Sequence, residues 1–173
     1  MLIRQEIPSD YEEVFEVNRL AFGQDEEAVL VSRLRMSNAF VGNLSLVALI
    51  NHLIVGHILF TKIDIVNGPK STYESLALAP MCVRPTFQKK GFGGLLIEAG
   101  LNKARELGFK SVIVMGHEHY YPKFGFLPAE KWGIKPPFDV PSPLFMGIEL
   151  VENGLKNVSG VVKYAKEFDS IIE

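Results

Sequence analysis

The chain has 173 residues, of which 47% are hydrophobic and 22% charged, and its formal net charge is −2. This composition is typical of a globular protein with a sizeable core, and the slight acidic balance argues against a general nucleic-acid binder, which normally carries an excess of Lys and Arg. The single cysteine, Cys82, cannot form an internal disulfide, so we expect a reducing, cytoplasmic environment.

The first 35 residues predict one strand and two helices. The segment MLIRQEI has no apolar core long enough for a signal peptide, and its alternation predicts a strand. A helix is expected within PSDYEEVFEVNRLAF, where Ser9 and Glu12 have the spacing of a capping box. A second short helix is expected within 26–35.

The middle of the chain predicts a hairpin of long strands at 43–50 and 53–66. Asn51 and His52 interrupt this apolar region, so it is interpreted as a strand pair, and we expect no membrane partner. The next strand is expected at 71–83. It contains Pro80, which cannot donate a ladder hydrogen bond, so a break or bulge is predicted there.

From Gly91 the hydrophobic period becomes helical, and the helix is expected to end near Gly108. SVIVMG, at 111–116, predicts a short buried strand, so that strand, helix and strand form a βαβ unit with parallel strands. HEHYYPKFG predicts a short helix or turn.

The remainder of the chain is expected to be less regular. Residues 128–143 hold five of the ten prolines and predict an ordered loop or lid. LFMGIEL is expected to be the last strand, with a polar tail after it. The prediction is one α+β (mixed α/β) domain spanning 1–173, with a core at about 2–150 and an extension at 151–173. Its sheet is expected to be mostly antiparallel with one parallel crossover.

The most informative stretch is VRPTFQKKGFGGLLIEAG, in which glycines at 91, 93 and 94 stand at the start of a predicted helix. A helix start exposes about four unpaired N–H groups and about half a positive charge. Glycines there let a phosphate approach the backbone. Gln88, Lys89 and Lys90 add donors, two of them charged, and the set suits a diphosphate.

The spacing excludes two common nucleotide motifs. A P-loop needs its lysine after the glycines, and a dinucleotide fingerprint needs a third glycine where this chain has Leu96. QKKGFG instead fits Gln/Arg-x-x-Gly-x-Gly/Ala, and YYPKFGF fits Tyr-x-Lys/Arg-x-Gly-Phe about thirty residues later. On these two segments the chain resembles the GNAT superfamily of N-acetyltransferases, strongly at 75–127 and weakly elsewhere within 2–150.

The resemblance implies a GNAT-like acyl-CoA N-acyltransferase fold, with a twisted sheet flanked by helices and one parallel strand pair splayed at a bulge. It also implies that acetyl-CoA is the co-substrate. In such a fold the loop holds the pyrophosphate and the main chain of the splayed strand faces the pantetheine arm. By resemblance, the cofactor-binding residues are Met81, Cys82, Val83, Gln88, Lys89, Lys90, Gly91, Phe92, Gly93 and Gly94.

Tyr121 is the predicted catalytic acid, because it falls on the tyrosine of the family's second segment and a phenol stays protonated at neutral pH. Tyr120 is the alternative. The general base stays open, since the position that carries a glutamate in some members is Ala77 here, and Glu74 has the opposite strand parity. Further candidates that could act through water are His117, Glu118 and His119.

Several other readings of these residues are disfavoured. HEH does not have the spacing of a zinc motif, so no metal is expected. Cys82 lies in an apolar strand, which argues against a nucleophile. Trp132 and the proline-rich loop either line an acceptor site or cover a sheet edge.

The leading hypothesis is direct acetyl transfer from acetyl-CoA to a primary amine of a small molecule in a ternary complex. The alternatives are a catalytically idle acyl-CoA-binding or regulatory module, and a protein N-acetyltransferase. In a fold of this kind, acceptor specificity is expected to depend on the first helices and on the loops around 22–40 and 128–143. A homodimer is left open.

Overall fold

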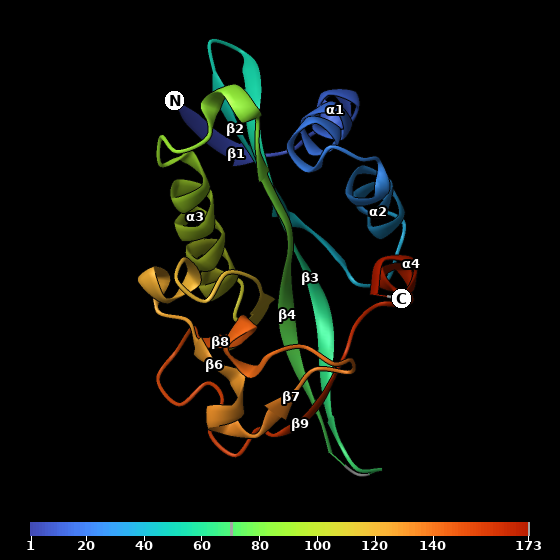
Figure 1. Ribbon diagram of the computed structural model, residues 1–173, viewed down its shortest axis with the longest axis vertical. Helices are drawn as coiled ribbons and strands as arrows, with labels where there is room; N and C mark the ends of the chain where they lie inside the picture. Colours follow the sequence, from blue (N-terminus) through green and yellow to red (C-terminus); the bar gives the residue numbers. More distant parts are fainter. Residues whose placement is uncertain (70, 173) are drawn as a thin grey trace.

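The computed structural model describes residues 1–69 and 71–172. The described residues form a nine-stranded sheet (Figure 1). Its strands are β1 (Leu2–Gln5), β2 (Phe40–Ile50), β3 (Leu53–Asn67), β4 (Ser71–Val83), β5 (Ser111–Met115), β6 (Leu127–Pro128), β7 (Ile134–Lys135), β8 (Phe145–Glu149) and β9 (Gly160–Lys163). The helices are α1 (Tyr11–Phe22), α2 (Glu26–Leu34), α3 (Phe92–Glu106) and α4 (Asp169–Ile172).

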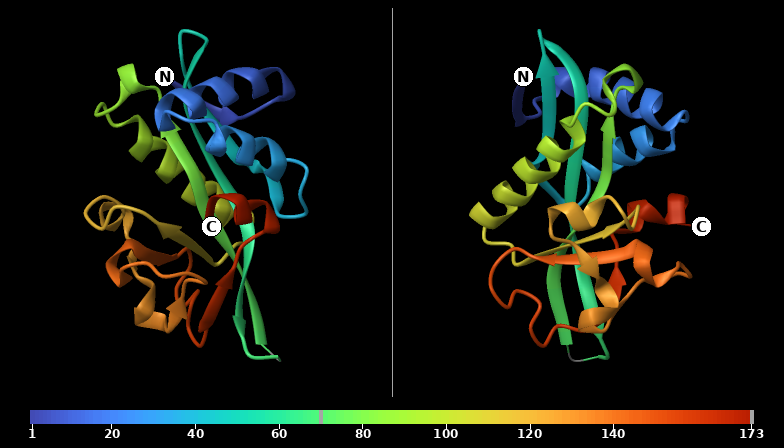
Figure 2. Two further views of the ribbon diagram at one scale, coloured as in Figure 1. Left: turned by 45° about the vertical axis from the view of Figure 1, so that its right-hand side comes forward. Right: turned by 60° about the vertical axis from the view of Figure 1, so that its left-hand side comes forward.

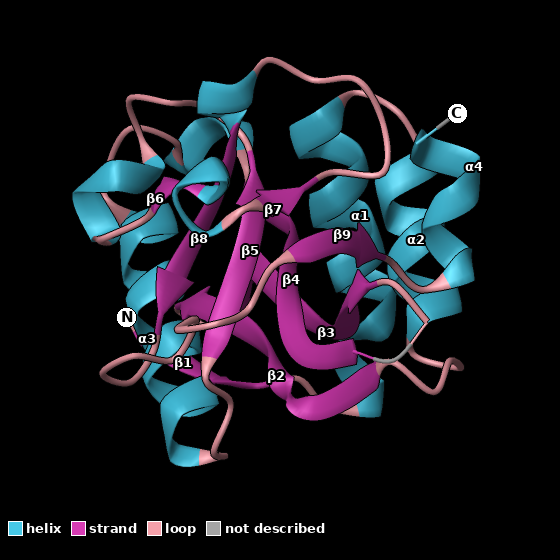
Figure 3. Cartoon of the chain, turned by 90° about the horizontal axis from the view of Figure 1, so that it is seen from below, coloured by secondary structure: helices cyan, strands magenta, loops and turns pink. Residues whose placement is uncertain are grey.

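The sheet is mixed and mostly antiparallel, which confirms the predicted α+β fold class. Its order is β1-β2-β3-β4-β5-β8-β6, and β9 joins β3 and β7. Two pairings are parallel, the predicted β4–β5 crossover and the short β7–β9 pair. Because β3 is fifteen residues long, it pairs with β2 along one part of its length and with β9 along another (Figure 3).

Helices cover both faces of the sheet (Figure 2). On one face α3 buries Leu96, Ile97 and Leu101 against β2, β3 and β4. On the other face α1 and α2 bury Val14, Val17, Leu30, Val31 and Leu34 in a second apolar cluster. Cys82 lies in this second cluster, so β4 is anchored to the α1–α2 layer from one side and to the α3 layer from the other.

The break predicted at Pro80 is present as a bulge. Ile58 pairs with Met81 and Phe60 pairs with Leu78, so three steps along β4 oppose two along β3. The parallel pairing of β4 with β5 is limited to Leu76–Val112 and Ala77–Ile113. Beyond Ala77, β4 has no β5 partner within the described ranges, so the two strands diverge as the resemblance implies.

Three local predictions need correction. The Ser9–Glu12 capping box is absent, because Pro8–Asp10 form a 3₁₀ turn and the Asp10 carboxylate accepts the Ile7 N–H at 2.8 Å. The proline-rich stretch contains β7 and two 3₁₀ turns. The tail is not only polar, because β9 joins the sheet and Val162 and Phe168 are buried in the core.

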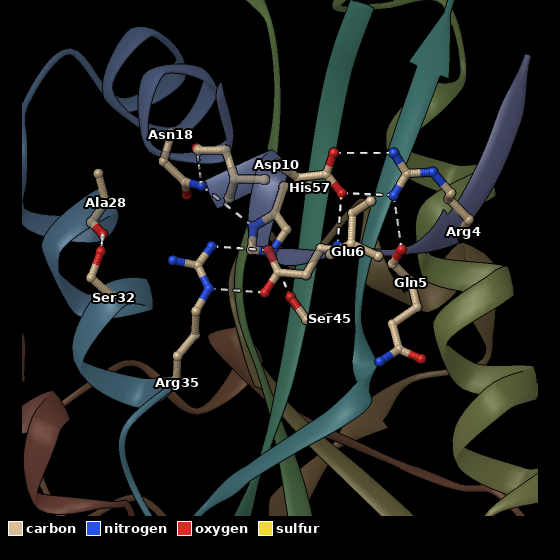
Figure 4. A network of polar contacts seen from close by, with 12 residues as sticks. Arg4, Gln5, Glu6, Asp10, Asn18, Ala28, Ser32, Arg35, Ser45 and His57 are labelled. Atoms are coloured by element: carbon tan, nitrogen blue, oxygen red, sulfur yellow. Dashed lines mark hydrogen bonds and ion pairs between the residues drawn. The ribbon is translucent and has the colours of Figure 1, made fainter. Parts of the chain in front are cut away.

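A buried polar network lies between the α1–α2 layer and the sheet (Figure 4). Arg35 forms two hydrogen bonds of 2.9 Å with the Glu6 carboxylate. His57, fully buried, contacts Ser45 Oγ through Nε2 at 3.0 Å and Asn18 Nδ2 through Nδ1 at 3.4 Å. Since the Asn18 amide nitrogen can only donate, the neutral ring carries its proton on Nε2 and donates it to Ser45.

This network predicts that the protein loses stability as the pH falls from 6.5. Burial lowers the pKa of His57 to about 4, despite the opposing charge of Glu6. Between these pH values the unfolded chain binds a proton at this histidine and the folded chain does not. From pH 7 to pH 5, we therefore expect the free energy of unfolding to fall by about 2 kcal/mol through His57 alone.

Urea unfolding at several pH values measures this slope. The variant His57→Gln should show a flatter dependence, whereas His119→Gln, which alters an exposed imidazole, should keep the wild-type slope. The Glu6 carboxylate affects the free energy of unfolding at lower pH than His57 does. Burial raises its pKa, but Arg35 and the other partners outweigh this and the pKa is lowered overall, so its contribution is lost only below about pH 4.5. Equal slopes in the wild type and His57→Gln would contradict the assignment.

Candidate functional site

The start of α3 has the backbone conformation that the glycine pattern predicts. Gly91 is the N-cap residue and has a left-handed conformation, with φ of 88°. No side chain of a described residue caps this end, so the first N–H groups of the helix remain available. Their partial positive charge and the absence of side chains at Gly93 and Gly94 make this helix end suitable for an anion.

A groove of about 600 Å³ begins at this helix end and runs along β4. It brings together nearly all of the predicted cofactor-binding residues: Met81, Cys82, Val83, Gln88, Lys89, Gly91, Phe92, Gly93 and Gly94. Lys90 is the exception. Its Nζ lies 5.6 Å from the centroid of the Phe87 ring, and it is not among the described residues that line the groove.

Gln88 has a structural contact that the sequence pattern does not reveal. Its Nε2 donates a hydrogen bond of 3.0 Å to the main-chain carbonyl of Val83. The side chain thus ties the turn before α3 back to the end of β4. Gln88 and the neighbouring Lys89 both line the groove.

Tyr121 begins the 3₁₀ turn Tyr121–Phe124 that follows β5, and its side chain is largely buried. Its ring packs edge-on against Tyr120 and Phe126, with centroid distances of 5.2 and 5.7 Å. No hydrogen bond within the described residues engages its hydroxyl. Burial, with a smaller contribution from Tyr120, raises the pKa of Tyr121 to about 12, so the phenol is protonated throughout the physiological range.

Tyr120, the alternative acid, faces the start of α3. A Cβ added at Gly93 would lie 3.0 Å from the Tyr120 hydroxyl and 3.4 Å from the Met81 side chain. Tyr120 therefore forms part of the wall beside the glycine turn, and Tyr121 also lines the groove.

Gly116 leaves room for the Tyr121 ring. A Cβ at this position would overlap the Tyr121 ring. We expect Gly116→Ala to displace the hydroxyl and to lower kcat by about 10- to 100-fold, with little change in coenzyme affinity. Steady-state kinetics with a coenzyme titration would measure both, with Gly42→Ala, on β2, as a control elsewhere in the fold. An unchanged kcat would show that the position of the ring does not matter.

A second cavity, of about 250 Å³, lies at the bulge of β4. Residues 77–81 of β4 form one wall, and the ends of α1 and α2, strand β5 and the C-terminal segment form the others. The lining is apolar and aromatic apart from Glu27: Phe22, Leu30, Ala77, Leu78, Ala79, Pro80, Met81, Ile113, Met115, Tyr121, Phe138, Tyr164, Phe168 and Ile171.

The groove and the cavity meet at three shared residues. Phe22, Met81 and Tyr121 line both of them. A molecule that follows β4 from the glycine turn therefore reaches the cavity beside Tyr121. This arrangement can bring two ligands together, one entering along the groove and the other held in the cavity.

Known proteins that are similar to this chain identify its family. The profile described as the Acetyltransferase (GNAT) family matches residues 9–126. The chain belongs to the GNAT acetyltransferase family. It is 39% identical over 134 residues to the uncharacterised N-acetyltransferase YjhQ of Escherichia coli K12, covering 77% of this chain and 74% of YjhQ. It is also 30% identical to the uncharacterised N-acetyltransferase YhbS of the same strain, over 98% of this chain and 99% of YhbS.

Two solved structures share the fold of this GNAT protein over nearly its whole length. The crystal structure of E. coli YhbS in complex with CoA has a TM-score of 0.89 at 27% identity, covering 97% of this chain and 91% of that chain. A GNAT family acetyltransferase from Brucella melitensis in complex with acetyl-CoA has a TM-score of 0.77 at 29% identity, covering 97% of each chain.

The candidate general bases lie mostly outside the groove and the cavity. Glu74 is exposed and pairs with Asp64 across the hairpin, as its strand parity predicts. Glu118 and His119 are exposed, and Glu118 Oε1 lies 3.6 Å from His119 Nε2. His117 lines the groove and not the cavity. Glu27, which lines the cavity, is not among the predicted bases, although it lies within the segment 22–40 that is expected to determine specificity.

The structure also locates Cys82 and Trp132. Burial raises the pKa of the Cys82 thiol to about 12, which makes it a poor nucleophile. Trp132 packs over the sheet near Gly147 and is not a lining residue of the cavity within the described part of the chain. Within that part, no cluster of three or more His, Cys, Asp or Glu side chains is arranged to hold a metal ion. No helix there is long and apolar enough to cross a membrane.

Proposed function

We propose that this GNAT protein transfers the acetyl group of acetyl-CoA to the primary amine of a small molecule, by direct transfer in a ternary complex. The observation that carries the proposal is the meeting of groove and cavity at Tyr121 and Met81. The relatives crystallised with CoA and with acetyl-CoA support the choice of co-substrate. The groove's size, its glycine turn and its lysine fit such a molecule.

The parts of the groove suit different parts of the coenzyme. The N–H groups at the start of α3 and the ammonium group of Lys89 would bind the pyrophosphate. The pantetheine arm would lie along β4 where β5 diverges, since an unpaired strand edge offers main-chain hydrogen bonds to an extended ligand. The thioester would then lie at Met81, next to the cavity.

Tyr121 would act on the departing sulfur as a hydrogen-bond donor. The ammonium form of the amine first loses a proton to water. The neutral nitrogen then forms a bond to the carbonyl carbon, the carbon–sulfur bond breaks, and one amine proton ends on sulfur. A phenol with a pKa of about 12 cannot give its proton fully to a thiolate with a pKa near 8.5 without a cost of about 5 kcal/mol. It can stabilise the developing charge on sulfur while the amine supplies the proton.

Two measurements test this function. Acetyl-CoA at about 100 times its Kd should stabilise the fold by about 2.7 kcal/mol, which for a chain of this size raises the Tm by about 5–10 °C. Free-thiol release with a broad panel of amines should then identify turnover above the rate of hydrolysis. No thermal shift would contradict the binding site, and a shift without any turnover would favour the second candidate.

That second candidate is a catalytically idle acyl-CoA-binding module. The observation that favours it is Ala77, a buried alanine on the cavity wall at the position where some family members carry a catalytic glutamate. A base is not always needed, because an α-amine with a pKa near 7.8 is partly neutral at pH 7. A protein N-acetyltransferase is the third candidate, and the small volume of the cavity argues against it.

A further inference from the structure

The cavity has the chemistry of a site for an apolar body that carries one positive charge. The rings of Phe138 and Tyr164 stack with a centroid distance of 6.1 Å, and the centroids of Tyr164 and Phe168 lie 5.3 Å apart. The loop before β8 and the C-terminal segment therefore form one aromatic wall. The volume of about 250 Å³ is small for a ligand site. It suits a molecule of one ring or a short alkyl chain.

Glu27 supplies the negative charge that would pair with such a cation. It is the only ionisable side chain other than the tyrosines among the described residues lining the cavity. Gln24 holds its carboxylate by hydrogen bonds of 2.7 and 3.1 Å to the two oxygens. Glu27 lies at the start of α2, close in sequence to Phe22, which belongs to both the cavity and the groove. A cation held by Glu27 would thus share the cavity with Phe22, a residue of the junction.

We infer that the acceptor is a small monoamine with an apolar, aryl or alkyl body, and that Glu27 draws its nitrogen into the cavity. This inference rests on the proposed acetyl transfer and specifies its acceptor. The apolar walls favour the body by removing it from water, and aromatic faces also attract a cation. A polyamine or an aminosugar would bring further charges or hydroxyl groups into walls that offer them few partners, and this is costly.

The test measures binding in the presence of saturating CoA, where no transfer takes place. The probes are phenethylamine, 2-phenylethanol, ethylamine and spermidine, each titrated by calorimetry. Phenethylamine should bind at least 10-fold more tightly than each of the others. Glu27→Gln should weaken phenethylamine binding about 10-fold or more and leave 2-phenylethanol unchanged. Glu26→Gln, an exposed neighbour on the same helix turn, is the matched control and should behave as wild type.

A gain-of-function variant makes the test independent of any loss of folding. Ile171 lines the cavity and is 39% exposed, so Ile171→Glu adds a second carboxylate at its rim without burying a charge. This variant should bind spermidine more tightly than the wild type does.

Preferential binding of spermidine by the wild type, or equal binding of phenethylamine by the wild type and Glu27→Gln, would overturn the inference. Either result would leave the proposed function intact if another amine supports thiol release. The failure of CoA itself to bind would instead contradict the proposed function.

Discussion

Replacing Tyr121 by Phe is expected to lower kcat by about 100- to 1,000-fold while the Kd for acetyl-CoA stays within about twofold of the wild-type value. The hydroxyl is the group lost, and the ring that packs against Tyr120 and Phe126 remains. Because no described residue hydrogen-bonds to this hydroxyl, its removal leaves no buried partner unsatisfied, and the fold should keep its stability. Pre-steady-state thiol release with a separate coenzyme titration would measure the two effects.

Tyr120→Phe is the matched control, since it removes a hydroxyl from the neighbouring ring beside Gly93. It should keep most of the activity. A larger loss in Tyr120→Phe than in Tyr121→Phe would reverse the assignment of the two tyrosines. The pH profile gives a second check. Because the pKa of Tyr121 is raised to about 12, the wild-type rate should not decline through this group below about pH 11.

The sequence was informative where local backbone chemistry determines the structure. A proline within an apolar strand predicts a bulge, and the bulge lies at Pro80. Glycines at a helix start predict a backbone that a ligand can approach, and Gly91 adopts the left-handed conformation that this requires. The tyrosine of YPKFGF, Tyr121, lies where the groove and the cavity meet, and its role in catalysis stays a prediction.

Prediction failed where a residue's role depends on contacts distant in sequence. The tail GVVKYAKEF carries too weak a pattern to show that it pairs with β3, and only the folded chain places Tyr164 and Phe168 against the cavity. Glu27 belongs to an ordinary acidic first turn, a feature that usually serves the helix dipole. Its place beside an apolar cavity follows from the packing of α2 on the sheet.

The largest effect on coenzyme binding is expected from Gly93→Glu. The new side chain would occupy the space between the start of α3 and Tyr120, where even a Cβ lies 3.0 Å from the phenolic oxygen. It would also place a negative charge where the pyrophosphate is proposed to bind. We expect the affinity for acetyl-CoA to fall by at least 100-fold and the coenzyme-dependent rise in Tm to vanish.

Leu95→Glu separates these causes from a general effect of charge on the helix. Leu95 lies in the same first turn and is 42% exposed, and it does not line the groove in the described structure. The same charge there should reduce coenzyme affinity only slightly, because solvent screens it. Gly93→Ala should fall between the two, since it adds steric contact with Tyr120 and no charge. A normal thermal shift in Gly93→Glu would mean that the coenzyme does not bind at this helix end, and the roles given to Lys89 and β4 would fail with it.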